Sequence, residues 1–162
     1  MPNWCDNHLT IRSDNPELLT RYRAAIEAGR LLTECRPEPD SESYRASLGA
    51  SGAMPEWYEW RVTNWGTKWE ISTRDTGEIS ETADEISVSF SSAWSPPVPA
   101  LQHAAQRDGF SFVLFYCEEG IGFVGRATED DEDCREFNEV DDETRAAWSA
   151  EGYDAPIYEG NA

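Results

Sequence analysis

Residues 110–128, FSFVLFYCEEGIGFVGRAT, decide the fold. The first ten form a nearly continuous apolar run, which is typical of a strand buried in the middle of a sheet. The remainder, GIGFVGRAT (120–128), starts with glycines and then alternates, which predicts a second strand that pairs with the first as a hairpin. This hairpin is the part of the predicted sheet around which the other elements are placed.

The preceding sequence predicts further strands and two helices. WCDNHLTIR (4–12) has the alternation of a first strand, and EISVSFSSAW (85–94) that of another. Between them, Asn15 is placed to cap a helix that starts at Pro16, and Gly29 is placed to end it. The segment PPVPALQHAAQRDG (96–109) predicts a second, proline-led helix that closes at its final glycine.

Residues 57–70, WYEWRVTNWGTKWE, contain four of the seven tryptophans and the only lysine. Trp57, Trp60, Arg61 and Asn64 recur at helical spacing, and a glycine at 66 can end that helix in the left-handed conformation. The following TKWEIST (67–73) alternates like a strand, which we expect to pair with 85–94. The stretch is therefore predicted to be a junction that holds a helix against the sheet.

The order strand, helix, strand, strand, helix, strand predicts an α+β fold. It corresponds to the ferredoxin-like (split βαβ) arrangement, an antiparallel sheet with two helices on one face, here with an extra hairpin strand. We expect a domain over residues 1–128, interrupted by a Pro- and Ser-rich insertion at 36–56 that forms a lid or a partly helical flap. Residues 129–162 are predicted to be an acidic extension, too charged to hold a core, in which a short helix docks Trp148.

Four blocks of the sequence carry a resemblance to a known family. They are MPNWCDN (1–7), PEWYEWRVTNWGTKWE (55–70), SSAWSPP (91–97) and YCEEGIGFVG (116–125). Together, and in this order, they resemble the YubB-like family of phage and plasmid proteins with a ferredoxin-like domain. The resemblance implies that fold and a mobile-element setting. The family lacks an assigned activity, so the resemblance assigns no catalytic residue.

The charge of the chain limits its partners. Thirty-two acidic against thirteen basic residues give a formal net charge of −19, and the last 34 residues contain thirteen of the acids and two of the bases. Such a surface repels nucleic acid and anionic lipid and favours a cationic partner. The sequence contains no long apolar run, no secretory signal pattern and no C-x-x-C pair. These features predict a cytoplasmic protein that binds neither membranes nor nucleic acid directly.

Motifs for catalysis are weak. GIGFVG (120–125) matches the spacing of a dinucleotide fingerprint, but it leads into a strand rather than a helix, so a glycine-rich hairpin is the better interpretation. Cys5 and His8 could ligate a metal, yet residues three apart on a strand point to opposite faces. We therefore expect no cofactor, no metal and no catalytic residue, and the sequence leans against an enzyme.

Two groups of residues remain as candidate sites. The ligand-binding candidates belong to the tryptophan junction: Trp57, Trp60, Arg61, Trp65, Lys68 and Trp69. The partner-binding candidates are the acids that follow the last predicted strand: Glu129, Asp130, Asp131, Glu132, Asp133, Glu136, Asp141, Asp142 and Glu143.

Three functions fit these groups. The leading hypothesis is a non-enzymatic mobile-element accessory protein whose carboxylates imitate the phosphates of nucleic acid and occupy the basic groove of a host defence or repair protein. One alternative is a small-ligand-binding protein or enzyme that uses the junction around Lys68, where a cation can lie over indole rings. The other is an ordinary acidic domain of a salt-adapted cell.

Overall fold

The structure is a computed structural model that describes residues 3–50 and 54–156. Its centre is an antiparallel sheet of six strands in the order β2-β3-β1-β4-β5-β6. The strands are β1 (Trp4–Arg12), β2 (Ser80–Glu81), β3 (Glu85–Ala93), β4 (Ser111–Glu118), β5 (Phe123–Thr128) and β6 (Glu132–Glu136). The helices are α1 (Pro16–Glu27), α2 (Leu31–Cys35), α3 (Glu42–Ser47), α4 (Glu56–Asn64), α5 (Val98–Asp108) and α6 (Asp142–Ala150), with short 3-10 turns η1 (Thr73–Asp75) and η2 (Phe137–Glu139).

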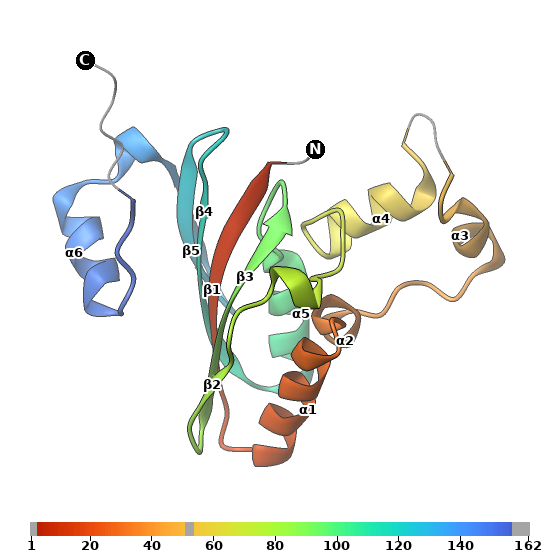
Figure 1. Cartoon of the computed structure of the whole chain (residues 1–162), viewed down its shortest axis with the longest axis horizontal. Coiled ribbons are helices and arrows are strands. Elements are labelled where there is room, and N and C mark those ends of the chain that lie inside the picture. The colour runs from red at the N-terminus through yellow and green to blue at the C-terminus, as the bar shows by residue number, and fades with distance from the viewer. Residues whose placement is uncertain (1–2, 51–53, 157–162) are drawn as a thin grey trace.

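The first four strands and helices α1 and α5 form the predicted ferredoxin-like core. β1 lies in the middle of the sheet, antiparallel to β3 on one side and to β4 on the other. α1 and α5 cover one face together with α2, and Figure 1 shows this helix layer on the opposite side of the sheet from α6. The α+β fold class is therefore confirmed. None of the helices in the described part of the chain is both long enough and apolar enough to cross a membrane.

α1 begins and ends as its sequence predicts. The Asn15 side chain accepts hydrogen bonds from the backbone N–H groups of Glu17 and Leu18, which a helix start leaves without partners inside the helix. Pro16 occupies the first turn, where a missing N–H is harmless. The face that α1 buries against the sheet includes Leu19, Tyr22 and Ile26.

β4 is apolar on both faces, and this corrects the expectation that the chain after Thr128 is too acidic to hold a core. Leu114 and Tyr116 point into the helix-covered core, whereas Phe115 and Cys117 belong to a second cluster on the other face. The C-terminal segment supplies the cover for that cluster through Phe137, Val140, Trp148 and Ala155. It also adds β6 to the sheet beside β5. The expected short helix is α6, and its Trp148 is docked as predicted.

The predicted strand at 67–73 is wrong: this segment is an irregular loop followed by η1. The reason lies in Glu70, whose carboxylate accepts hydrogen bonds from the backbone N–H groups of Leu32 and Thr33 at the start of α2, both at 2.8 Å. Ile71 is buried beside it in the helix-side core. The alternation in TKWEIST therefore does not indicate a strand. It arises because Glu70 caps α2 and Ile71 packs in the helix-side core. The neighbour of β3 is instead the two-residue β2.

Part of the predicted insertion is helical, which agrees with the expectation of a partly helical flap. α3 packs against α4 through Tyr44, whose ring meets that of Trp60 edge-on with centroids 5.8 Å apart. Figure 1 shows α3 at the end of the molecule farthest from α6. Residues 51–53, which also belong to the predicted insertion, lie outside the described residues.

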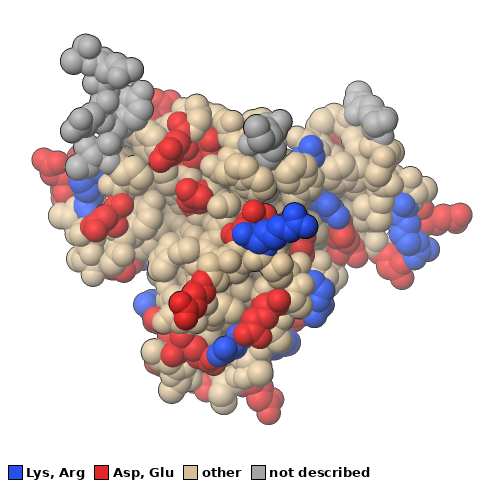
Figure 2. Space-filling model, in the orientation of Figure 1, with Lys and Arg blue, Asp and Glu red and all other residues tan. Residues whose placement is uncertain are grey.

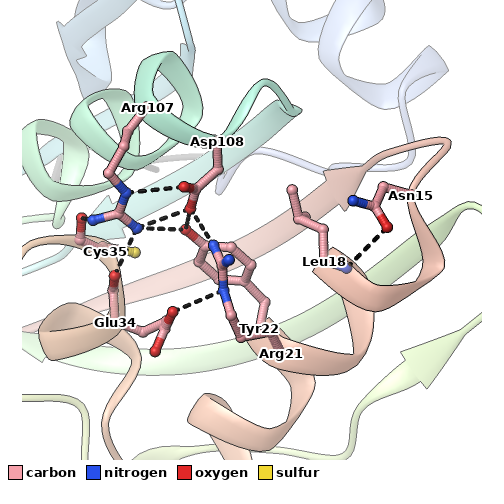
Figure 3. A network of polar contacts seen from close by, with 8 residues as sticks. All are labelled: Asn15, Leu18, Arg21, Tyr22, Glu34, Cys35, Arg107 and Asp108. Carbon is pink, nitrogen blue, oxygen red and sulfur yellow. Dashed lines mark hydrogen bonds and ion pairs between the residues drawn. The ribbon is translucent and has the colours of Figure 1, made fainter.

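α2 has only five residues and is held from both ends by side chains of other elements. Glu70 binds its first N–H groups, and Arg107 of α5 donates to the carbonyl oxygens of Glu34 and Cys35 at its C-terminal end, at 2.9 and 3.0 Å. Arg107 also binds the neighbouring Asp108, which accepts a hydrogen bond from Tyr22 of α1 at 2.6 Å (Figure 3). One polar network thus joins the three helices of the layer. α2 depends on these contacts, because an isolated helix of this length is not stable in water.

Protonation of Asp108 should weaken this network in acid. Hydrogen bonds from Arg107 and Tyr22 and the charges of Arg107 and Arg21 lower the pKa of Asp108 to about 2, against the opposing effect of burial. Because the folded-state pKa is depressed, its stabilising contribution is present above about pH 4 and is lost as the pH falls through about 2. The arginines are partly exposed, so we expect a contribution of about 1–2 kcal/mol.

Urea unfolding followed by tryptophan fluorescence between pH 7 and pH 2 measures this contribution. Asp108→Asn should lower the free energy of unfolding at neutral pH, and the curves of the variant and the parent should converge as the pH approaches 2. Parallel curves would show that Asp108 does not contribute through its charge.

Gly66 ends α4 in a position that only glycine tolerates. Its φ is +86°, and a Cβ there would lie 2.5 Å from the Pro99 side chain and 2.8 Å from the Pro96 carbonyl oxygen. Gly66→Ala should therefore cost about 3 kcal/mol, the sum of backbone strain and overpacking. Gly109→Ala is the matched control, because Gly109 also has a positive φ of +75° but has open space around the Cβ position. The control should cost about 1 kcal/mol; equal losses in chemical denaturation would contradict the steric argument.

Candidate functional site

The tryptophan junction contains one closed cluster built around Arg61. The Arg61 guanidinium lies 5.3 Å from the ring centre of Trp57 and 4.9 Å from that of Trp65. Its Nε donates to Glu38 at 2.6 Å, and the same carboxylate oxygen accepts a hydrogen bond from the Tyr44 hydroxyl. Arg61 is thus enclosed by two rings and one carboxylate, which leaves little of it for a ligand.

Trp65 and Trp60 belong to the core rather than to a binding surface. Trp65 is 1% exposed, and its indole N–H donates to the carbonyl oxygen of Arg36 at 2.8 Å. Trp60 packs edge-on against Trp65 with ring centres 5.7 Å apart and is only partly exposed. These rings hold α4 and the segment after α2 together, as a buried tryptophan with a satisfied N–H does.

Lys68 and Trp69 form the accessible part of the junction. The Lys68 ammonium lies 4.9 Å from the ring centre of Trp69 and 5.7 Å from that of Tyr58, a cation–π arrangement. Trp69 is 38% exposed, and its ring centre is 6.3 Å from that of Trp4, which is 43% exposed. The structure therefore separates the predicted set: Lys68 and Trp69 face solvent, whereas Trp65 and Arg61 stabilise the fold.

Two exposed tryptophans near Lys68 and Trp69 were absent from the sequence-based candidates. Trp4 lies beside Trp69, and Trp94 follows β3 with a φ of +72°, which is unusual for a residue other than glycine. The backbone N–H of Trp94 donates to Asn3, and the loop before Lys68 is tied to this strand end because Thr67 donates to the Ala93 carbonyl oxygen at 2.7 Å. The sequence signal was available, since each of these tryptophans ends or starts a predicted strand, where no core position is expected.

Several of the predicted partner-binding acids stabilise the fold. Glu129 accepts a hydrogen bond from the Phe112 backbone at 3.1 Å, and Glu132 accepts one from the Tyr116 hydroxyl at 2.7 Å. Asp133 pairs with Arg135 at 2.9 Å. Asp141 caps α6 by accepting from the Thr144 backbone at 2.7 Å, and the Thr144 hydroxyl and this backbone contact lower its pKa. Sequence reasoning could not assign the roles of Glu129 and Glu132, because their partners lie on β4. Asp133 and Asp141 have partners only two and three residues away, so the nearby arginine and the capping position were signals that the sequence offered.

The remaining predicted acids are exposed on folded elements. Asp130 and Asp131 occupy the turn between β5 and β6, while Asp142 and Glu143 are in the first turn of α6. Glu136 lies at the end of β6 and forms a capping box with Glu139 at η2. Figure 2 shows acidic side chains scattered over the visible face, with basic ones among them. The carboxylates of this region are therefore held in place by the fold rather than carried on a free chain.

The described residues offer no cluster of three or more side chains suited to a metal ion. Cys5 is fully buried under the helix layer, and His8 lies on the opposite face of β1, as their spacing predicts. GIGFVG forms the turn and the start of β5, so it is the glycine-rich hairpin that the sequence indicates.

The strand order, with β1 between β3 and β4 and two helices on one face, defines a ferredoxin-like α+β domain. A family model described as "Ferredoxin-like domain in Api92-like protein" matches residues 64–159, and the chain belongs to this family. The matched range includes the C-terminal segment that covers the second face of the sheet.

The fold is similar to the crystal structure of a protein api92 from Yersinia pseudotuberculosis. The TM-score is 0.51 at 10% sequence identity, and the similarity covers 84% of this chain and 98% of that chain. At this identity the similarity concerns the fold alone. No curated protein sequence matches the chain.

Arg61 and Lys68 should respond differently to substitution. Arg61→Ala should lower the free energy of unfolding by about 2–3 kcal/mol, because it leaves the half-buried Glu38 carboxylate without its cation. Lys68→Ala, at a partly exposed position where the lysine forms no ion pair with the described residues, should change it by no more than about 0.5 kcal/mol. Thermal and urea denaturation of the two variants, measured side by side, provide the test. A large loss for Lys68→Ala would contradict its assignment to the accessible part of the junction.

Proposed function

We propose that this protein acts without catalysis, by binding a basic protein through the acidic edge formed by the β5–β6 turn, β6 and the start of α6. The setting would be a phage or plasmid, and the partner a host defence or repair protein whose nucleic-acid groove is basic. The observation that carries the proposal is the fixed placement of these carboxylates. They lie on β6 of the sheet, in the turn before it and in the first turn of α6, which packs on the sheet, so they can meet a partner as a preformed surface.

Charge supports this choice of partner. From Glu129 onward the chain contains thirteen acids and two bases. Closely spaced carboxylates can replace the row of phosphates that dominates the affinity of nucleic-acid-binding proteins. A preformed charged surface also avoids the entropic cost of ordering a flexible segment on binding. We therefore expect association that is fast at low salt and weakens steeply as salt is added.

β6 is one of the two edge strands of the sheet, and its charged side chains favour contact through side chains. Glu132 and Glu136 are exposed on it, and Asp130 and Asp131 precede it in the turn. Charged side chains on an edge discourage the addition of another strand. A partner is therefore met by the carboxylates rather than by the open backbone of the edge.

The variant that tests the proposal neutralises exposed acids without disturbing the fold. Asp130→Asn, Asp131→Asn, Asp142→Asn and Glu143→Gln are combined, and the acids that cap α6 or bind Phe112 and Tyr116 are kept. The matched control neutralises four exposed acids elsewhere, namely Asp14, Glu42, Glu59 and Glu78. Truncation after Thr128 is unsuitable, because it would expose the cluster around Phe115 and so report on folding.

Partners captured from a host lysate are then identified, purified and titrated with each variant at several salt concentrations. The parent and the control should bind a basic nucleic-acid-binding protein in competition with duplex DNA. The edge variant should bind about tenfold or more weakly, with a shallower dependence on salt. If the edge variant and the control weaken binding equally, the general acidity of the chain and not this edge is responsible, as expected for a salt-adapted domain, and the proposal fails.

A second candidate function is small-ligand binding at the accessible part of the junction. It is favoured by one observation, the exposed Trp69 ring with the chain's only lysine held over it. A ligand with a flat apolar part and an acidic group would use the ring and the ammonium together. Lys68→Ala is expected to remove such binding while the acidic-edge variant retains it, so the same variants separate the two functions.

A further inference from the structure

A polar groove lies on the sheet face opposite the helix layer, beside the part that α6 and its flanking segments cover. It has a volume of about 530 Å³. Its lining includes Asp6 and His8 of β1, Ser89 and Ser91 of β3, the segment 74–77 that starts in η1, and Tyr153 from the C-terminal segment. Four parts of the chain that are far apart in sequence therefore meet around it.

The floor of the groove consists of two cross-strand pairs. His8 lies directly opposite Ser89, and its Nδ1 is 3.0 Å from the Ser89 hydroxyl oxygen. Asp6 lies opposite Ser91 and accepts a hydrogen bond from its hydroxyl at 2.8 Å. These pairs fix the side chains of the floor, while the second carboxylate oxygen of Asp6 is left to accept from a ligand.

The walls of the groove rise on both sides of this two-strand floor. On the outer side, segment 74–77 runs along β3, where Thr76 forms a β-bridge with Phe90 and the Gly77 N–H donates to the Ser89 carbonyl oxygen at 2.8 Å. On the inner side stands Tyr153, whose ring is stacked on Phe115 of β4 at 4.5 Å. The floor is therefore bounded by a polar wall and an aromatic one.

The charges of the groove have opposite signs on different elements. Asp6 is on the floor, whereas Arg74 is on the outer wall. Within the described part of the chain, Arg74 forms no ion pair, although most arginines of this acidic protein do. Asp75 stands next to it, so the groove as a whole is not a site for a purely anionic ligand. A ligand with one positive and one negative group complements it.

The dimensions of the floor indicate the length of that ligand. The distance from β1 across β3 to segment 74–77 is two strand spacings, or about 10 Å. The side chains of Asp6 and Arg74 occupy part of this span. Two residues of extended peptide cover about 7 Å. A dipeptide can thus place its ammonium group near Asp6 and its carboxylate near Arg74, with a side chain against Tyr153.

We propose that this groove binds a dipeptide-sized zwitterion, whose ammonium group pairs with Asp6 and whose carboxylate pairs with Arg74. The site is separate from the acidic edge and from the junction around Lys68, and it does not depend on the function proposed for either. Tyr153 links the groove to the C-terminal segment, because this segment covers one face of β4 and also forms one wall of the groove.

The test uses three peptides that differ only in their terminal charges: Ala-Ala, N-acetyl-Ala-Ala and Ala-Ala-amide. Binding to the intact protein is followed by 1H-15N NMR, with the amides of Gly77, Ser89 and Ser91 as reporters of the groove. We expect saturable shifts at these amides with Ala-Ala, and affinities about tenfold or more weaker for each of the two blocked peptides.

Two conservative variants assign each charge to its partner. Asp6→Asn keeps an oxygen that accepts from Ser91, and it should weaken Ala-Ala binding to the level of the N-acetyl peptide, whose own binding stays unchanged. Arg74→Gln should do the same for the carboxylate and leave the amide peptide unaffected. Arg45→Gln, at an exposed position on α3, is the control and should bind like the parent. Equal affinity for all three peptides, shifts outside the groove or no saturable binding of Ala-Ala would each overturn the proposal.

Discussion

The structure depends on one constraint, the need to cover both faces of β4. Its apolar side chains alternate between two clusters, with Leu114 and Tyr116 on one side and Phe115 and Cys117 on the other. Two helices can cover only one face of such a sheet, so the second face needs another layer. The C-terminal segment provides it, although it is the most acidic part of the chain, because Phe137, Val140 and Trp148 point inward while the carboxylates point outward or cap the turns. The free energy gained by burying these large side chains exceeds the free-energy cost of placing solvated charges on the surface.

This second layer also determines where the surfaces that could bind partners lie. It covers the apolar half of the face, over β4 and β5, and leaves the half formed by β1 and β3 open, where hydroxyl, imidazole and carboxylate groups need no cover. The same segment presents the acidic edge on its outer side. One packing requirement thus produces an acidic surface, a polar groove and the boundary between them. Both proposed interactions depend on the C-terminal segment being folded.

The prediction from sequence succeeded where the pattern was local. The capping of α1 by Asn15, the left-handed glycine at 66, the end of α5 at Gly109 and the hairpin of β4 and β5 all follow from neighbouring residues. It failed at 67–73, because the alternation there arises from Glu70 capping a distant helix. The candidate site was predicted in part: Lys68 and Trp69 are accessible, but Trp65 is core and Arg61 is enclosed by Trp57, Trp65 and Glu38. Among the acids, the structural roles of Glu129 and Glu132 depend on partners in β4, distant in sequence, whereas Asp141 caps its own helix.

The sequence by itself determined the order of the core elements β1, α1, β3, α5, β4 and β5, the ferredoxin-like class and the strong negative charge, since periodicity, capping residues and composition are properties of short segments or of simple counts. Tertiary structure alone decided that the acidic C-terminal segment is a layer of the fold, that α2 is held between Glu70 and Arg107, and that Asp6, Arg74 and Tyr153 meet around one groove. Each of these depends on which residues come together across the sheet. The local pattern indicates that β4 is buried, but it does not specify which segment covers each of its faces.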